Sequence, residues 1–168
     1  MTHPRADQLR FARSEWQRGL VGLTDEDARR RLLPMNSISW MIGHLAWHER
    51  LIWFVRGQGL EVEPILDSVA SGQPATTPPL DEMLAVWARI TAAADPFIDT
   101  LTTESLEVPL PFDKREPPSV AGSQFQRITY HYWNHIGEAS AVRQILGHAD
   151  VPEYVGDLDG LAPYRREA

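Results

Sequence analysis

Four of the six histidines in this sequence form two pairs with the same spacing. His44 and His48 are four residues apart, and so are His131 and His135. Residues at this spacing on an α-helix lie about one turn apart on the same face, where two imidazoles can bind one divalent metal ion. Both pairs lie near the apolar stripe of a predicted helix, so both face the expected core. Four buried imidazoles cost free energy unless their ring nitrogens have partners, and a metal ion would supply such a partner.

The other residues that could take part in chemistry give weaker signals. Glu138 follows His135 by three residues, and it could fix the tautomer of an imidazole, accept a proton, or lie on the helix surface. His3 and His148 flank the predicted helices and are expected at the solvated surface. The segment that begins at His131 lacks the glutamate that follows the first histidine of a metalloprotease helix. No phosphate-binding P-loop and no nucleophile-elbow motif supports another reaction class.

Helical periodicity between prolines and glycines predicts the elements that must position the histidines. Strand signals are nearly missing, and Pro96 should kink the third long helix or shift its end. The prediction is an all-α four-helix bundle. Its four long helices are expected over residues 4–19, from Ser37 to Gly57, over 80–102 and over 120–146, with a short helix over 24–33.

We expect a single domain over residues 1–168. Two proline-rich connections, 61–79 and 109–118, are expected to run over the surface and to form the mouth of a pocket. The bundle should cover about residues 4–147. Gly147 is a typical helix-ending residue, and residues 148–168 should form an extended tail.

Composition restricts the classes of function. The 168 residues include 16 Lys and Arg against 23 Asp and Glu, a net charge of −7, which argues against a sequence-independent nucleic-acid binder. The most apolar stretch, residues 38–55, contains too many polar groups for a membrane span. The first residues do not resemble a signal peptide, so a cytoplasmic location is expected. The chain has no cysteine, so any sulfur nucleophile must come from a small thiol.

The second long helix is apolar nearly all the way round. Met41, Leu45 and Ile52 define one apolar stripe, while Ile42 and Trp53 lie on the opposite side. A helix of this kind is usually buried on both sides. In a chain of this size a second copy could cover the second side, so a homodimer is expected.

Two segments of the sequence resemble one known family. Residues 36–45, Asn-Ser-Ile-Ser-Trp-Met-Ile-Gly-His-Leu, resemble the opening of the second helix in DinB/YfiT-like proteins, a superfamily of four-helix bundles. Residues 131–138, His-Tyr-Trp-Asn-His-Ile-Gly-Glu, and residues 143–147, Arg-Gln-Ile-Leu-Gly, resemble the signature of its fourth helix. The order and spacing of the helices extend the likeness over roughly residues 5–150.

The resemblance implies a metal site with one histidine from the second helix and two from the fourth. Carried over by position, the ligands are His44, His131 and His135, and the metal is a divalent ion such as zinc or nickel. Spacing alone does not choose between His44 and His48, so His48 could be a fourth ligand or a base that faces the substrate. Glu138 stands where the family commonly has glutamine, and proton transfer or support of an imidazole remain open for it.

Related proteins are metal-dependent transferases or isomerases that use small thiols such as mycothiol, bacillithiol or glutathione. The resemblance therefore implies a thiol S-transferase for detoxification or stress, with a small-molecule substrate and a thiol cosubstrate. Arg50 and Arg127 are candidates for holding carboxylates of the thiol. Two alternatives use the same histidines: metal-assisted hydrolysis with water as the nucleophile, and non-catalytic binding of a metal or ligand in a stress-response module.

Overall fold

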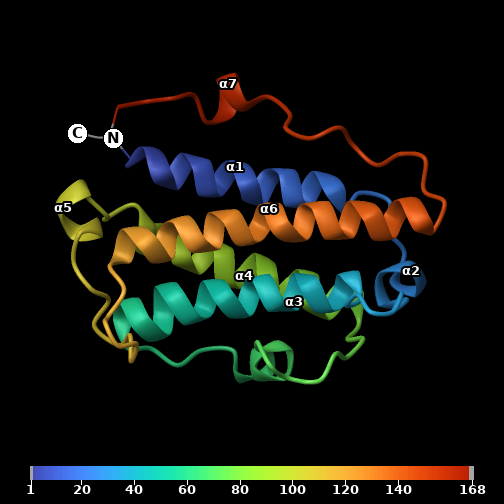
Figure 1. Cartoon of the computed structure of the whole chain (residues 1–168), viewed down its shortest axis with the longest axis horizontal. Helices are drawn as coiled ribbons and strands as arrows, with labels where there is room; N and C mark the ends of the chain where they lie inside the picture. The colour runs from blue at the N-terminus through green and yellow to red at the C-terminus, as the bar shows by residue number, and fades with distance from the viewer. Residues whose placement is uncertain (1, 167–168) are drawn as a thin grey trace.

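Four long helices lie side by side in the computed structural model, which describes residues 2–166 (Figure 1). They are α1 (Pro4–Gly19), α3 (Ile38–Glu49) with its continuation η1 (Arg50–Arg56), α4 (Leu80–Ile98) and α6 (Ala121–Ile145). Helix α1 packs against α6, and α3 packs against both α4 and α6. The described residues form no strand, only an isolated bridge between Pro109 and Val120. The expected all-α four-helix bundle is confirmed.

The ends of these helices follow from local sequence. Ser37 caps α3, because its Oγ accepts a hydrogen bond from the backbone N–H of Trp40 at 3.3 Å. Thr24 caps the short helix α2 (Asp25–Arg29) in the same way through the N–H of Asp27. Beyond the end of α6, Gly147 has a φ of +87°, a left-handed conformation that favours glycine. Two of these features bound the helices that carry the clustered histidines, α3 at its start and α6 at its end.

Two helices are shorter than the sequence pattern indicates. Helix α4 ends at Ile98 rather than near residue 102, with Pro96 in its last turn. Proline has no N–H to continue the helical hydrogen bonds, and Thr102 then caps a separate short helix, α5 (Thr103–Leu106). Helix α2 ends at Arg29 rather than at residue 33, because Arg30 already has an extended backbone.

The second long helix changes its type half-way along. Residues 38–49 are α-helical, whereas residues 50–56 form the π-helix η1, with hydrogen bonds to the carbonyl five residues earlier. The predicted end near Gly57 is correct. The change of helix type was not predicted. The seven residues of η1 are apolar on most sides, so their sequence shows no periodicity that would distinguish a π-helix from an α-helix.

Both apolar sides of this second helix are buried within the chain itself. Ile42 and Trp53 are fully buried, and Phe54 is buried as well. The covering elements are α4, α6 and the 3-10 helix η2 (Pro64–Val69). The apolar pattern that suggested a homodimer is thus accounted for without a second copy. The homodimer stays a prediction.

The connection over residues 61–79, expected at the surface, enters the core in part. Its helix η2 contributes Leu66 and Val69, both fully buried, and packs against α3. Arg50 holds the segment by donating to the carbonyl oxygens of Val62 and Glu63, each at 3.2 Å. Two apolar side chains at a spacing of three, directly after Pro64, are the reason that this segment folds inward.

Residues 148–166 run back along α1 and include the short helix α7 (Leu158–Leu161) (Figure 1). The N–H of Gly156 donates to Oε2 of Glu15 at 2.9 Å, and Arg18 donates to the carbonyl oxygen of Glu153 at 2.7 Å. The expected tail is mostly without regular structure, and these bonds fix it to the bundle.

A buried network of charged and aromatic side chains ties the four long helices together. Glu49 is fully buried and accepts hydrogen bonds from Nε and Nη2 of Arg13 at 2.8 and 2.7 Å. Nε1 of Trp53 and the hydroxyl of Tyr132 donate to the same carboxylate at 2.6 and 2.9 Å. Trp87 of α4 donates to the hydroxyl of Tyr132 at 2.8 Å. Every oxygen of this buried carboxylate has partners, as a buried charge requires.

Candidate metal centre

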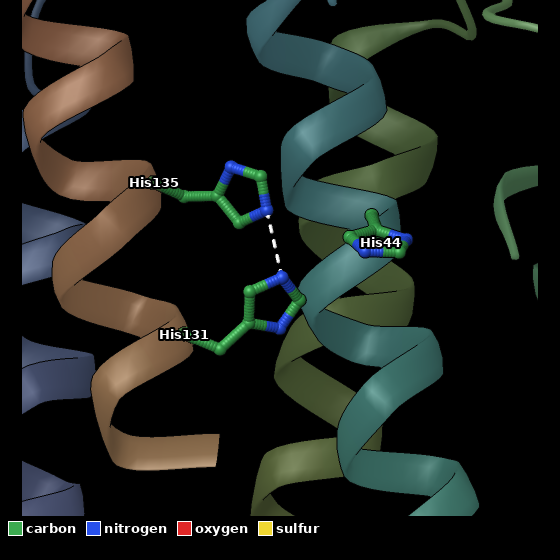
Figure 2. A group of neighbouring side chains, drawn as sticks. All are labelled: His44, His131 and His135. Carbon is green, nitrogen blue, oxygen red and sulfur yellow. Dashed lines mark hydrogen bonds between the residues drawn. The ribbon is translucent and has the colours of Figure 1, made fainter. Parts of the chain in front are cut away.

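Three histidines from two helices meet between α3 and α6. His44 comes from α3, and His131 and His135 come from α6 (Figure 2). Each offers one ring nitrogen, and these three nitrogens all lie within 4.8 Å of one another. In Figure 2 the rings of His131 and His135 point from α6 toward α3, and their Nε2 atoms are 3.0 Å apart. The structure thus brings both histidines of the fourth long helix together with one of the second.

This set of donor atoms fits a divalent transition-metal ion. Imidazole suits zinc, copper, iron and nickel. Zinc–nitrogen bonds of about 2.0–2.1 Å at a tetrahedral angle would place two ligand nitrogens about 3.3 Å apart, close to the 3.0 Å between His131 and His135. Three protein ligands also leave a coordination position open. The cluster could therefore bind a metal ion together with a second molecule.

Two of the three histidines are held in the tautomer that a ligand needs. The Nδ1–H of His44 donates to the carbonyl oxygen of Val69 at 2.8 Å, and that of His135 donates to Oε2 of Glu138 at 2.9 Å. A carbonyl and a carboxylate only accept, so these protons are assigned to Nδ1 and each Nε2 keeps its lone pair. Such bonds orient a ligating imidazole and raise its basicity. Because Val69 belongs to η2, the inward-folded connection is part of the site.

His48 lies beside the cluster and contacts His131. The Nδ1 atoms of the two rings are 2.7 Å apart, so one donates to the other. When His131 uses Nε2 as a ligand atom, its own proton is on Nδ1, and Nδ1 of His48 is the acceptor. In that arrangement His48 supports His131 as Glu138 supports His135.

Burial keeps these imidazoles uncharged. It is the main cause that lowers the pKa of His44 to about 4, of His48 to about 3 and of His131 to about 2. Neighbouring histidines lower each pKa further, and the cations of Arg56 and Arg127 do so for His48. These three imidazoles are therefore neutral at neutral pH, the form in which histidine binds a metal.

Two tryptophans enclose the ring of His44. The ring of Trp40 stacks on it at a centroid distance of 4.4 Å, and the ring of Trp47 stacks on it at 5.2 Å, both within 17° of parallel. Stacking on both faces fixes the plane of the imidazole. This role of the two tryptophans was not predicted from the sequence. The signal was the spacing, since Trp40 and Trp47 lie one turn before and one turn after His44.

A cavity of about 690 Å³ opens beside the cluster. Its wall includes His44, His48 and His131, so the candidate metal centre faces this space. Ser71 and Arg115, one from each proline-rich connection, also line it. The volume lies in the range of small-molecule sites, about 300–1,000 Å³. A small molecule can therefore reach the histidines.

A comparison with protein families agrees with this architecture. The DinB superfamily model matches residues 8–139. The chain belongs to the DinB superfamily. The matched range extends from α1 into α6 and includes all three clustered histidines of this DinB-superfamily bundle. No match was found among curated proteins. Over residues 2–166, the helices lack the combination of length and apolar character that a membrane crossing needs.

The remaining candidate residues of this DinB-superfamily chain lie in different places. Arg127 lines the cavity, whereas Arg50 donates to the carbonyls of residues 62 and 63. The prediction that His3 lies at the solvated surface is wrong: it is 8% exposed, because its Nδ1 caps the start of α1 and its ring packs beside α5. His148 is half-buried and lies 3.3 Å from a carboxylate oxygen of Asp27.

Proposed function

We propose that this chain is a metal-dependent S-transferase that joins a small thiol to an electrophilic molecule. His44, His131 and His135 would hold a divalent ion such as zinc or nickel, which supplies Lewis-acid chemistry that lowers the pKa of a bound thiol or water. The observation that carries the proposal is a buried group of three imidazole nitrogens beside a cavity of about 690 Å³. The family membership of the chain supports it.

The residues around the cavity favour a thiol over water as the nucleophile. The described lining contains no Asp or Glu, and Glu138 is already bonded to Nδ1 of His135. Water has a pKa of about 15.7 and needs strong help to ionise, whereas a thiol with a pKa of about 8.5 needs less. Because the chain has no cysteine, the sulfur enters as a cosubstrate.

The transfer step needs little acid or base catalysis from the side chains of the protein. The thiol loses its S–H proton to water in the open cavity, and a lone pair on sulfur forms a bond to the electrophilic carbon. The leaving group departs with the electron pair of its former bond to that carbon. His48 is a weak proton acceptor, with a pKa lowered to about 3 mainly by burial. We therefore give His48 and Glu138 the role of holding the imidazoles of His131 and His135 in place.

Metal content tests the first part of the proposal. Protein purified without a histidine tag should contain about one equivalent of zinc or nickel per chain by elemental analysis. His131→Ala should lose this metal, because two imidazoles and no carboxylate then remain in the group. His148→Ala is the matched control, since it removes a histidine outside the cluster, and it should keep the metal. Full occupancy in His131→Ala would refute the assigned site.

Thiol dependence tests the reaction. The metal-loaded chain is incubated with a chromogenic aryl halide and with mycothiol, bacillithiol or glutathione, and product is followed by absorbance. Turnover should need both thiol and metal and should be lost in His131→Ala. Turnover without any thiol would indicate metal-assisted hydrolysis, and metal binding with no turnover in the whole set would indicate a binding module. Either result contradicts the transferase.

A further inference from the structure

Three arginines line the cavity of a chain that is acidic overall. Arg56, Arg115 and Arg127 lie in its wall, and its described lining contains no carboxylate. The whole chain has a net charge of −7, so this local positive charge does not reflect a generally basic surface. Arg127 precedes His131 by four residues on α6, which places it on the helix face that carries the histidines.

The π-helix η1 brings Arg56 to this face of the second long helix. In a continuous α-helix, the eight steps from His48 to Arg56 would turn the chain by about 80° beyond two full turns. In π-helical residues each step turns the chain by about 82° rather than 100°, so the two α-helical steps and the six steps within η1 together end about 30° short of two full turns. Arg56 therefore points in nearly the same direction as His48, and both line the cavity.

The chain neutralises these arginines incompletely. A carboxylate oxygen of the buried Asp113 lies 3.8 Å from Nε of both Arg56 and Arg115, too far for a hydrogen bond. The oxygens of Asp113 accept hydrogen bonds from the backbone N–H groups of Arg115 and Ser119, both at 3.2 Å. Arg56 donates to the uncharged amide oxygen of Gln124 at 3.0 Å. One carboxylate is thus shared between two guanidinium groups.

Two further observations show that the positive charge is in excess. Burial lowers the pKa of Arg56, and repulsion from Arg115 and Arg127 lowers it further, against the opposite effect of Asp113. Among residues 2–166, Arg127 has no ion-pair partner within 4.0 Å. Three cations and one carboxylate therefore leave the wall of the cavity with an excess of two positive charges.

We propose that Arg56, Arg115 and Arg127 bind an oxyanion, a carboxylate or a phosphate, of the small molecule that reacts at the histidine cluster. A guanidinium group offers a planar pair of N–H donors that matches either anion. The arginines and the histidines share one cavity, so a molecule held by its anionic end places its other end near His48 and His131. The inference rests on the proposed function, because it names the class of molecule that this site takes.

Anion binding by the metal-free chain tests the inference. The full chain is treated with a chelator, dialysed into a buffer of low ionic strength, and titrated calorimetrically with inorganic phosphate in one arm and with succinate in the other. The test variant is Arg115→Met/Arg127→Met, in which Arg56 is kept because it contacts Gln124. The control is Arg30→Met, an exposed arginine next to α2, at the opposite end of the bundle (Figure 1).

We expect one of the two anions to bind, and the tighter arm identifies the anionic group. Charge-assisted hydrogen bonds contribute about 1.5–3 kcal/mol, so the double variant should bind at least about tenfold more weakly, whereas Arg30→Met should stay within about twofold. Thermal melting shows that both variants are folded. No binding in either arm would overturn the inference, and so would equal binding by the wild type and the double variant.

The metal content of the same wild-type preparation, measured before chelation, separates the two proposals. A chain that holds metal and binds neither anion refutes the arginine site and leaves the metal centre intact. A chain that binds an anion through Arg115 and Arg127 and holds no metal supports the arginine site and refutes the proposed transferase.

Discussion

The buried pair of Arg13 and Glu49 should dominate the stability of the bundle. Their side chains are 6% and 0% exposed, and two hydrogen bonds of 2.8 and 2.7 Å join them. Glu49→Gln removes the negative charge and leaves the guanidinium buried, with Asp95 at 2.8 Å as its remaining charged partner. Removing one member of a buried pair costs about 3–5 kcal/mol. We expect a loss of this size in the free energy of unfolding.

The reverse change should cost a similar amount, and the two changes should not add. Arg13→Met leaves the carboxylate of Glu49 with only two neutral donors, Trp53 and Tyr132, and again costs about 3–5 kcal/mol. The double variant contains no unpaired buried charge. It should therefore lose less than about 4 kcal/mol, rather than the sum of about 6–10 kcal/mol.

Urea unfolding, followed by far-UV circular dichroism and tryptophan fluorescence, measures all three variants. Tyr132→Phe is the control, because it removes a hydroxyl that donates to Glu49 and changes no charge, and it should cost about 1–2 kcal/mol. Losses that add to within about 0.5 kcal/mol would refute the reasoning that an unpaired buried charge causes the destabilisation.

Two further predictions concern the histidine site. The first concerns the metal-free chain, in which the pKa values of His44, His48 and His131 are lowered. Below about pH 6.5 the unfolded state binds more protons than the folded state, so the free energy of unfolding should fall with the pH. The loss should reach at most about 1.4 kcal/mol per pH unit for each histidine. Urea midpoints between about pH 7.5 and 5 should show this fall, His131→Ala should reduce it, and an unchanged midpoint would contradict it. Gly43→Ala would place a Cβ 2.5 Å from Sδ of Met83 and 3.1 Å from Cγ2 of Val69, so both side chains must shift and we expect a loss of about 1–3 kcal/mol. We also expect weaker metal binding, since the carbonyl of Val69 orients His44. A raised melting temperature with unchanged metal affinity would contradict this prediction, because the neighbouring side chains would then accommodate the methyl group without loss of stability.

Much of the fold and the histidine cluster could be predicted, because these features repeat with the period of an α-helix. The apolar pattern predicted the long helix that carries His44, and Gly147 predicted the end of the helix that carries His131 and His135. Spacing alone did not separate His44 from His48. Their difference depends on the carbonyl of Val69, which belongs to a segment 25 residues further along the chain.

The features that escaped prediction depend on contacts between distant segments or on backbone form. The sequence alone does not distinguish the roles of Arg50 and Arg127. In the structure, Arg50 contacts the inward-folded connection, whereas Arg127 lines the cavity. The position of Arg56 depends on the π-helical backbone of residues 50–56, which no pattern in those seven residues indicates. The burial of His3 depends on its capping of α1 and on the nearby helix α5.

The π-helix η1 also affects how this chain should be compared with relatives of other lengths. A π-helical turn can absorb one inserted residue in an otherwise α-helical segment. If one residue between Arg50 and Arg56 were deleted and the segment became α-helical, seven steps of about 100° would still direct the arginine to within about 20° of His48. A superfamily member with a one-residue gap at this point can therefore present the same cation to its cavity. An alignment without that gap would pair Arg56 with a residue on a different face of the helix.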